Sequence, residues 1–324
     1  MLRLKKMSGV ALKTNNPLFF PYIIFLFFIP FHFVFGDAYL ASDRIYYSAD
    51  TYSVDYEKKI ITATGNAYYR KEQTEVKARK VVIHYAEEVK RAYFHDDVVL
   101  FDRETGREIR GAYGEAYYND DYYFVRDNGS YRDGERVITS GLIESLGEGR
   151  YTFTDDVVYT DDNVRVDSAK LEVLSDDTAN FTGDVRAESL EDGDEIFCDL
   201  IRYGIDTGDG HFQGDVLYIE HGENGLVLSA EVIKYFNTED YFILLEDVQV
   251  LSGEYSMGGS FVKYYREKRL VESQGETVVF DGEKTIYSGS MQLYLDLNKL
   301  SFLGGVRGII PEEERQDSRG SLDG

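Results

Sequence analysis

Five pairs of consecutive aspartates are the side chains in this sequence whose type and spacing could do chemistry. They lie at positions 96–97, 120–121, 155–156, 161–162 and 176–177. Paired carboxylates can act as the acid and base of a hydrolysis, and their oxygens can bind Ca²⁺. The pairs do not form the Gly-Gly-x-Gly-x-Asp repeat of calcium-binding β-helices. A repeated string, described below, accounts for two pairs and turns account for most others, so we expect a structural role.

The other groups that could act in catalysis or metal binding are isolated. The histidines at positions 84, 95, 211 and 221 show no metal-ligand spacing. Cys198 is the only cysteine, which excludes an intramolecular disulfide and suggests a small packing residue. No G-x-S-x-G string and no phosphate-binding loop occurs. The sequence therefore predicts no catalytic residue, no metal, no cofactor and no enzyme activity.

The elements that position these residues repeat along the chain. The string Phe212-Gln213-Gly214-Asp215-Val216 recurs at 181–185, 153–157 and 94–98, and in looser form at 63–67, 244–248, 273–277 and 302–306. A further copy is placed at 124–128. The fourth residues of the strings are Asn66, Asp97, Asp127, Asp156, Asp184, Asp215, Asp247, Glu276 and Gly305. The near-constant spacing of about 30 residues is typical of a repeat architecture with nine units.

Each string has the alternation of a β-strand. The first, third and fifth residues (Phe, Gly and Val) should face one way, and the acidic fourth residue should face the other. Stacked copies would line one face with apolar side chains. The predicted lining residues are Phe94, Val98, Phe153, Val157, Phe181, Val185, Phe212, Val216, Leu244, Val248, Phe302 and Val306.

A second column of small residues lies about half a period from the first. Its members are Ala49, Ala78, Gly114, Gly141, Ala169, Cys198, Ala230, Gly259 and Gly289. The alternating segments around them, and the Gly-containing turns between, predict two strands of about six to eight residues in each repeat. We therefore expect one all-β domain over residues 37–309, with about eighteen strands.

The two ends of the chain differ from this domain. Residues 1–36 have a basic start followed by an apolar run at 17–35, which predicts an export signal or an N-terminal membrane anchor. Either reading places the rest of the chain outside the cytoplasm. Residues 310–324 are polar and predict a disordered acidic tail.

The charge of the chain restricts its partners. The sequence has 59 acidic and 35 basic residues, and four of the basic ones lie within residues 1–36. Such an acidic protein lacks the basic surface that is needed to bind nucleic acids or anionic membranes. An apolar face lined by Phe, Val, Ala and Gly can form either a filled core or an open channel, and the residues alone favour neither.

The small-polar start of one strand (Ala49-Asp50, Ala230-Glu231) and the Gly-Asp/Asn step of the next (Gly65-Asn66, Gly183-Asp184) resemble the OstA-like family. This family contains LptA, LptC and the periplasmic part of LptD, which move lipopolysaccharide across the periplasm. The resemblance covers about residues 45–309. It implies an elongated, open β-jellyroll of stacked antiparallel strands, whose trough holds lipid acyl chains and whose edge strands pair with other Lpt proteins.

Together these observations predict a periplasmic protein that bridges or shuttles lipopolysaccharide, or a related glycolipid, towards the outer membrane. Its expected partners are that lipid, other OstA-like proteins bound by edge-strand pairing, and further copies of itself. Two alternatives stay open. One is an outer-membrane β-barrel, which the short predicted strands and the polar C-terminal tail disfavour. The other is a packed β-solenoid scaffold without lipid cargo.

Overall fold

The computed structural model describes residues 45–86, 91–117, 122–174, 177–222, 225–253, 255–282 and 284–309. The predicted signal or anchor at 1–36 and the predicted tail at 310–324 lie outside these residues. The described residues belong to one unit that begins at Ser42. No helix among them is long and apolar enough to cross a membrane.

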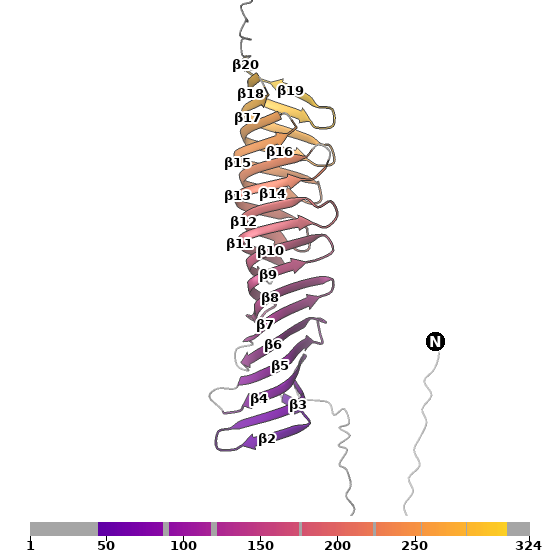
Figure 1. Cartoon of the computed structure of the whole chain (residues 1–324), viewed down its shortest axis with the longest axis vertical. Helices are drawn as coiled ribbons and strands as arrows, with labels where there is room; N and C mark the ends of the chain where they lie inside the picture. Colours follow the sequence, from indigo (N-terminus) through magenta and orange to yellow (C-terminus); the bar gives the residue numbers. More distant parts are fainter. Residues whose placement is uncertain are drawn as a thin grey trace, which may run out of the picture. The chain divides into compact units, whose positions relative to one another are not determined.

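One antiparallel sheet contains the twenty strands of the described residues, and each long strand pairs with the next along the chain (Figure 1). The strands are β1 (Ile45–Ser48), β2 (Thr51–Asp55), β3 (Ile60–Lys71), β4 (Thr74–His84), β5 (Arg91–Asp102), β6 (Glu108–Tyr117), β7 (Tyr122–Asp133), β8 (Arg136–Ser145), β9 (Tyr151–Thr160), β10 (Val164–Val173), β11 (Thr178–Ser189), β12 (Glu195–Gly204), β13 (Gly210–Glu220), β14 (Leu226–Phe236), β15 (Tyr241–Ser252), β16 (Tyr255–Tyr265), β17 (Leu270–Asp281), β18 (Lys284–Tyr294), β19 (Lys299–Leu303) and β20 (Arg307–Ile309).

The all-β prediction and the stacked hairpin repeat are confirmed. β1 and β2 both pair with β3, and β19 and β20 both pair with β18, so each couple acts as one interrupted strand. Counted in this way, the described residues form the eighteen strands that the repeat predicts. The predicted strand length is wrong, because β3 to β18 have 10 to 12 residues each.

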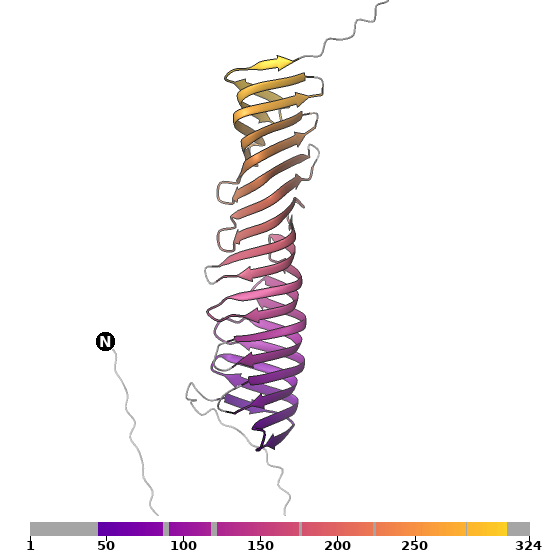
Figure 2. The same cartoon turned by 90° about the vertical axis from the view of Figure 1, so that its left-hand side faces the viewer.

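The sheet is open. Among the pairings of the described strands, none joins the β1–β2 end to the β19–β20 end. The open stack that the resemblance implies is therefore confirmed, and the strands stack one on the next along the long axis of the sheet (Figure 2).

A corner in the middle of each odd-numbered long strand folds the sheet. In β11, Gly183 and Asp184 both have positive φ angles, 83° and 46°, and the pair lies opposite the single residue Asp199 of β12. Two residues against one define a β-bulge, which bends its strand. Gly, Asn and Asp tolerate positive φ better than other residues, which explains why they occupy these two positions.

The same pair recurs in every odd strand from β3 to β15. Its members are Gly65-Asn66, Asp96-Asp97, Asp127-Asn128, Asp155-Asp156, Gly183-Asp184, Gly214-Asp215 and Glu246-Asp247. The prediction that the third residue faces inward with Phe and Val is therefore wrong. The chain turns at that residue, which leaves Gly183 exposed while Phe181 and Val185 on either side are buried.

The copy in β7 is shifted by one residue from its predicted place. The bulge pair there is Asp127-Asn128, so the string runs from Val125 to Gly129 and not from Phe124 to Asn128. Val125 is buried and Phe124 is only half-buried. The predicted register followed the phenylalanine, whereas the fold follows the two residues that can adopt positive φ.

The small column also has a different register. The residue paired with the fifth position of each string is Ala78, Gly111, Ser140, Ser168, Cys198, Ala230, Gly259 or Ser288. Gly114 pairs instead with Phe94, and Gly141, Ala169 and Gly289 lie opposite a bulge. The prediction is thus wrong at these four positions. The serines belong to the column because a hydroxyl can bond a nearby carbonyl: Ser140 Oγ donates to the carbonyl of Leu142 at 3.0 Å.

Candidate binding interior

The corners fold the two halves of the sheet towards each other. Tyr159 in β9 and Ala187 in β11 both pair with Val166 of β10, so they lie side by side across the strands. Phe181 lies six residues from Ala187 along β11. In a flat sheet, six residues would separate Tyr159 and Phe181 by roughly 20 Å. Their ring centroids are 5.4 Å apart. The interior is therefore the space between the two halves of the folded sheet.

Ten of the twelve predicted lining residues are buried in this interior. They are Phe94, Val98, Phe153, Val157, Phe181, Val185, Phe212, Val216, Leu244 and Val248. Phe302 is half-buried and packs against the core. Val306 is wrongly placed by the prediction, because it lies between β19 and β20 and is 53% exposed. Contact with lipid at these residues stays a prediction.

Aromatic rings join the two halves across the interior. A tyrosine from the second half of one odd strand packs against a phenylalanine from the first half of the next odd strand. The pairs are Tyr69 with Phe94 at 5.7 Å, Tyr131 with Phe153 at 5.5 Å, Tyr159 with Phe181 at 5.4 Å and Tyr218 with Phe242 at 4.9 Å. Over much of its length the interior is a packed core.

The packing is interrupted at β11. In all four pairs the tyrosine lies two residues after the fifth position of its string. From β3 to β17 the residues at this place are Tyr69, Leu100, Tyr131, Tyr159, Ala187, Tyr218, Val250 and Val279. Ala187 is the smallest side chain in this column. The prediction from the sequence overlooked the column, although the same period contains it.

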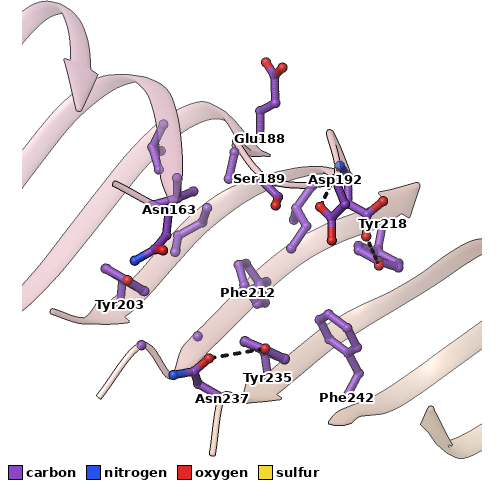
Figure 3. A pocket seen from close by; sticks show the side chains of 18 of the residues that line it. Asn163, Glu188, Ser189, Asp192, Tyr203, Phe212, Tyr218, Tyr235, Asn237 and Phe242 are labelled. Carbon is purple, nitrogen blue, oxygen red and sulfur yellow. Dashed lines mark hydrogen bonds between the residues drawn. The ribbon is translucent and has the colours of Figure 1, made fainter. Parts of the chain in front are cut away.

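A hollow of about 360 Å³ lies beside Ala187. Its apolar walls come from β10 to β15 and include Phe181, Ile201, Phe212 and Phe242. Figure 3 shows Phe212 within the hollow, with Tyr203 and Tyr235 around it. Phe212 is 7% exposed, whereas Phe153 and Phe181 are 0% exposed.

Charged residues from loops on opposite sides of the sheet lie at the rim of the hollow. Arg266, in the loop between β16 and β17, contacts Asp192 at 2.5 Å and Asp194 at 3.1 Å in the loop between β11 and β12. Asp194 is buried and also accepts hydrogen bonds from the Tyr218 hydroxyl at 2.6 Å and the His221 backbone N–H at 3.1 Å. These contacts tie the two halves together where the hollow opens.

The surroundings of Arg266 and Asp192 favour the charged forms of these two side chains. Burial by itself would lower the pKa of Arg266, but the nearby Tyr218 and Asp192 raise it. Burial would raise the pKa of Asp192, and the hydrogen bonds from Ser189 and Arg266 more than offset this effect, so its pKa is lowered. The ion pair is thus present at neutral pH.

Where the structure describes them, the residues first considered for chemistry have structural places, whereas Asp120, Asp121 and Asp176 lie outside the described residues. Asp96-Asp97 and Asp155-Asp156 form bulges, and Asp161 caps the turn between β9 and β10 by accepting from the backbone N–H groups of Asn163 and Val164. Cys198 is buried in the small column, and burial raises the pKa of its thiol to about 11. Within the described residues, no group of three or more His, Cys, Asp or Glu side chains could hold a metal ion.

Large apolar side chains are exposed at both ends of the sheet. Tyr52, Val54 and Tyr56 lie on or just after β2, and Leu303, Val306 and Ile309 lie on or between β19 and β20. Edge strands carry backbone groups that are free to pair with another strand. The two ends therefore combine apolar surface with an edge that pairs with no other described strand.

Comparisons with known proteins point to one family. Residues 46–147, from β1 to just beyond β8, match the model of the family described as LptA/(LptD N-terminal domain) LPS transport protein. Among solved structures, the chain is similar to LptH, the LptA-homologous periplasmic component of the lipopolysaccharide transport device of Pseudomonas aeruginosa. The identity is 16%, the match covers 34% of this chain and 81% of that chain, and the TM-score is 0.32, which is too low to support an argument. No curated protein matches by sequence.

Proposed function

Because the chain belongs to the OstA-like family of LptA and the LptD N-terminal domain, whose model matches residues 46–147, we propose that it is a periplasmic lipid-binding protein. It bridges or shuttles lipopolysaccharide, or a related glycolipid, towards the outer membrane. No reaction is part of this function.

The folded sheet with its apolar interior is the observation that carries the proposal. The strings and their paired positive-φ bulges continue beyond residue 147 as far as β15, and β17 has a bulge at the same place in its string. An acyl chain that enters between the two halves gains about 25 cal/mol for each Å² of apolar surface removed from water. The sugar of the lipid would stay in water beside the acidic outer surface.

The ends of the sheet support the proposed assembly with other proteins. A partner strand can add to β2 or to the β19–β20 edge through backbone hydrogen bonds, and the exposed apolar side chains there would be covered. We propose OstA-like partners, or further copies of this chain, as the added sheets. Stacked sheets would continue the apolar interior from one protein to the next.

A packed scaffold without lipid is the second candidate, because most interior side chains are fully buried. Photo-crosslinking in living cells separates the two. Crosslinkers placed at Val157, Val185 and Val216, on the interior side, should capture lipid. The matched controls are the exposed neighbours Asp156, Asp184 and Asp215, which should not capture it because they lie on the outer side of the corner.

The difference between the two sets is the decisive result. Contact with a membrane would label the outer positions at least as strongly as the inner ones. Equal labelling of both sets, or no labelling of either, would refute lipid transport and leave the scaffold as the better account.

A further inference from the structure

The hollow beside Ala187 lies where other repeats have a tyrosine ring. At the levels of β3, β7 and β9 a tyrosine covers the first residue of the next string, which is Phe94, Phe153 or Phe181. The corresponding first residue for β11 is Phe212, and the residue that would cover it is Ala187. The hollow thus replaces a ring that the repeat supplies at other levels.

We propose that this hollow is a binding subsite for the apolar chain of an amphiphile. The inference rests on the proposed function and adds to it a defined place in the interior. A volume of about 360 Å³ lies within the range of ligand pockets. Even an apolar cavity of roughly 150 Å³ can bind a benzene ring.

The lining determines the chemical class of the ligand. The inner walls carry Phe181, Ile201, Phe212 and Phe242, which offer no charged partner. The charged side chains lie at the rim, where Glu188, Glu191, Asp192 and Asp194 outnumber Arg266. The inner part therefore suits a hydrocarbon chain, and the acidic rim disfavours an anionic group close to it.

The rim contacts place the subsite at a point where the two halves of the sheet are held together. Arg266 joins loops that are more than 70 residues apart in the sequence. A chain bound in the hollow would lie directly beneath this ion pair. The ion pair would retain the chain in the interior while its head group remains outside.

The test uses the purified full chain in detergent-free buffer and the neutral dye 1-N-phenylnaphthylamine, whose fluorescence increases in apolar surroundings. Ala187→Tyr restores the ring that the repeat has elsewhere and should raise the Kd of the dye by at least about tenfold, equivalent to about 1.4 kcal/mol. Arg186→Tyr is the matched control, because it adds the same ring one residue away on the exposed face. It should leave the Kd within about twofold.

Ala187→Leu is a second, smaller substitution that keeps the test valid if the tyrosine variant misfolds. It should give an intermediate Kd, and its circular dichroism spectrum should be that of the wild type. Displacement of the dye by lipopolysaccharide or by a phospholipid distinguishes the two sources of an acyl chain, and displacement by neither would overturn the proposed ligand class. Equal dye binding by wild type and both Ala187 variants would overturn the subsite and leave lipid binding elsewhere in the interior. A wild-type protein that binds no dye and no lipid would overturn the subsite and the proposed function together.

Discussion

Truncation of two equivalent phenylalanines should have unequal effects on stability. Phe181 is 0% exposed and packs edge-to-face on Tyr159 with ring centroids 5.4 Å apart. Phe212 occupies the same place in its string, but it borders the hollow beside Ala187. We therefore expect Phe212→Ala to be the milder change.

The magnitudes follow from packing. Phe181→Ala should cost about 3–5 kcal/mol, the usual cost of removing a buried phenylalanine. An aromatic pair contributes about 0.5–1.5 kcal/mol beyond the area that it buries. Among the described rings, no aromatic pair includes Phe212, so Phe212→Ala should cost less than Phe181→Ala by at least this amount.

Native-state hydrogen exchange, read by mass spectrometry on peptides from β10 to β14, is the suitable assay. A repeat array need not unfold in one step, and exchange reports the opening free energy of each region separately. Phe280→Ala is the matched control, because this ring is 46% exposed and its loss should have little effect. A cost for Phe212→Ala equal to or above that of Phe181→Ala would refute the interpretation of the hollow as missing packing.

Two further predictions concern the corners and the rim. At Asp184, where φ is 46° and the side chain is exposed, Asp184→Asn should be neutral and Asp184→Val should cost about 1–2 kcal/mol in thermal or urea unfolding, because a β-branched residue resists positive φ; equal costs would contradict the role of the bulge. Because the pKa of Asp192 is lowered in the folded state, its stabilising effect is complete above the unfolded pKa of about 4 and is lost as the pH falls below that value. Hydrogen exchange in the loop between β11 and β12 should therefore become faster on acidification, and this acceleration should be smaller in Asp192→Asn. An identical pH dependence in the variant and the wild type would refute the stabilising role of the Asp192 carboxylate.

Local preferences made much of the fold predictable from the sequence. The repeat period, the all-β class and the burial of ten predicted lining residues follow from apolar side chains at fixed spacing and from Gly, Asp and Asn between them. The bulges are local as well, since each one from β3 to β15 consists of two adjacent residues with positive φ, nearly all of them Gly, Asn or Asp. Placing the β7 string on Phe124 failed because it used the ring, and not Asp127-Asn128, as the marker.

The candidate site was predictable only in its general lining. Which tyrosine covers which phenylalanine depends on how far the corners turn the two halves of the sheet, and that angle is a property of many strands together. Ala187 is one small side chain in a column of larger ones. The hollow that results can be recognised only when the fold places Phe212 across the interior from it. The ion pair of Arg266 with Asp192 and Asp194 joins residues more than 70 positions apart. The sequence by itself determined the repeat and its corners, which arise from neighbouring residues, whereas the tertiary structure decided the contacts across the interior, which arise from the fold of the whole sheet.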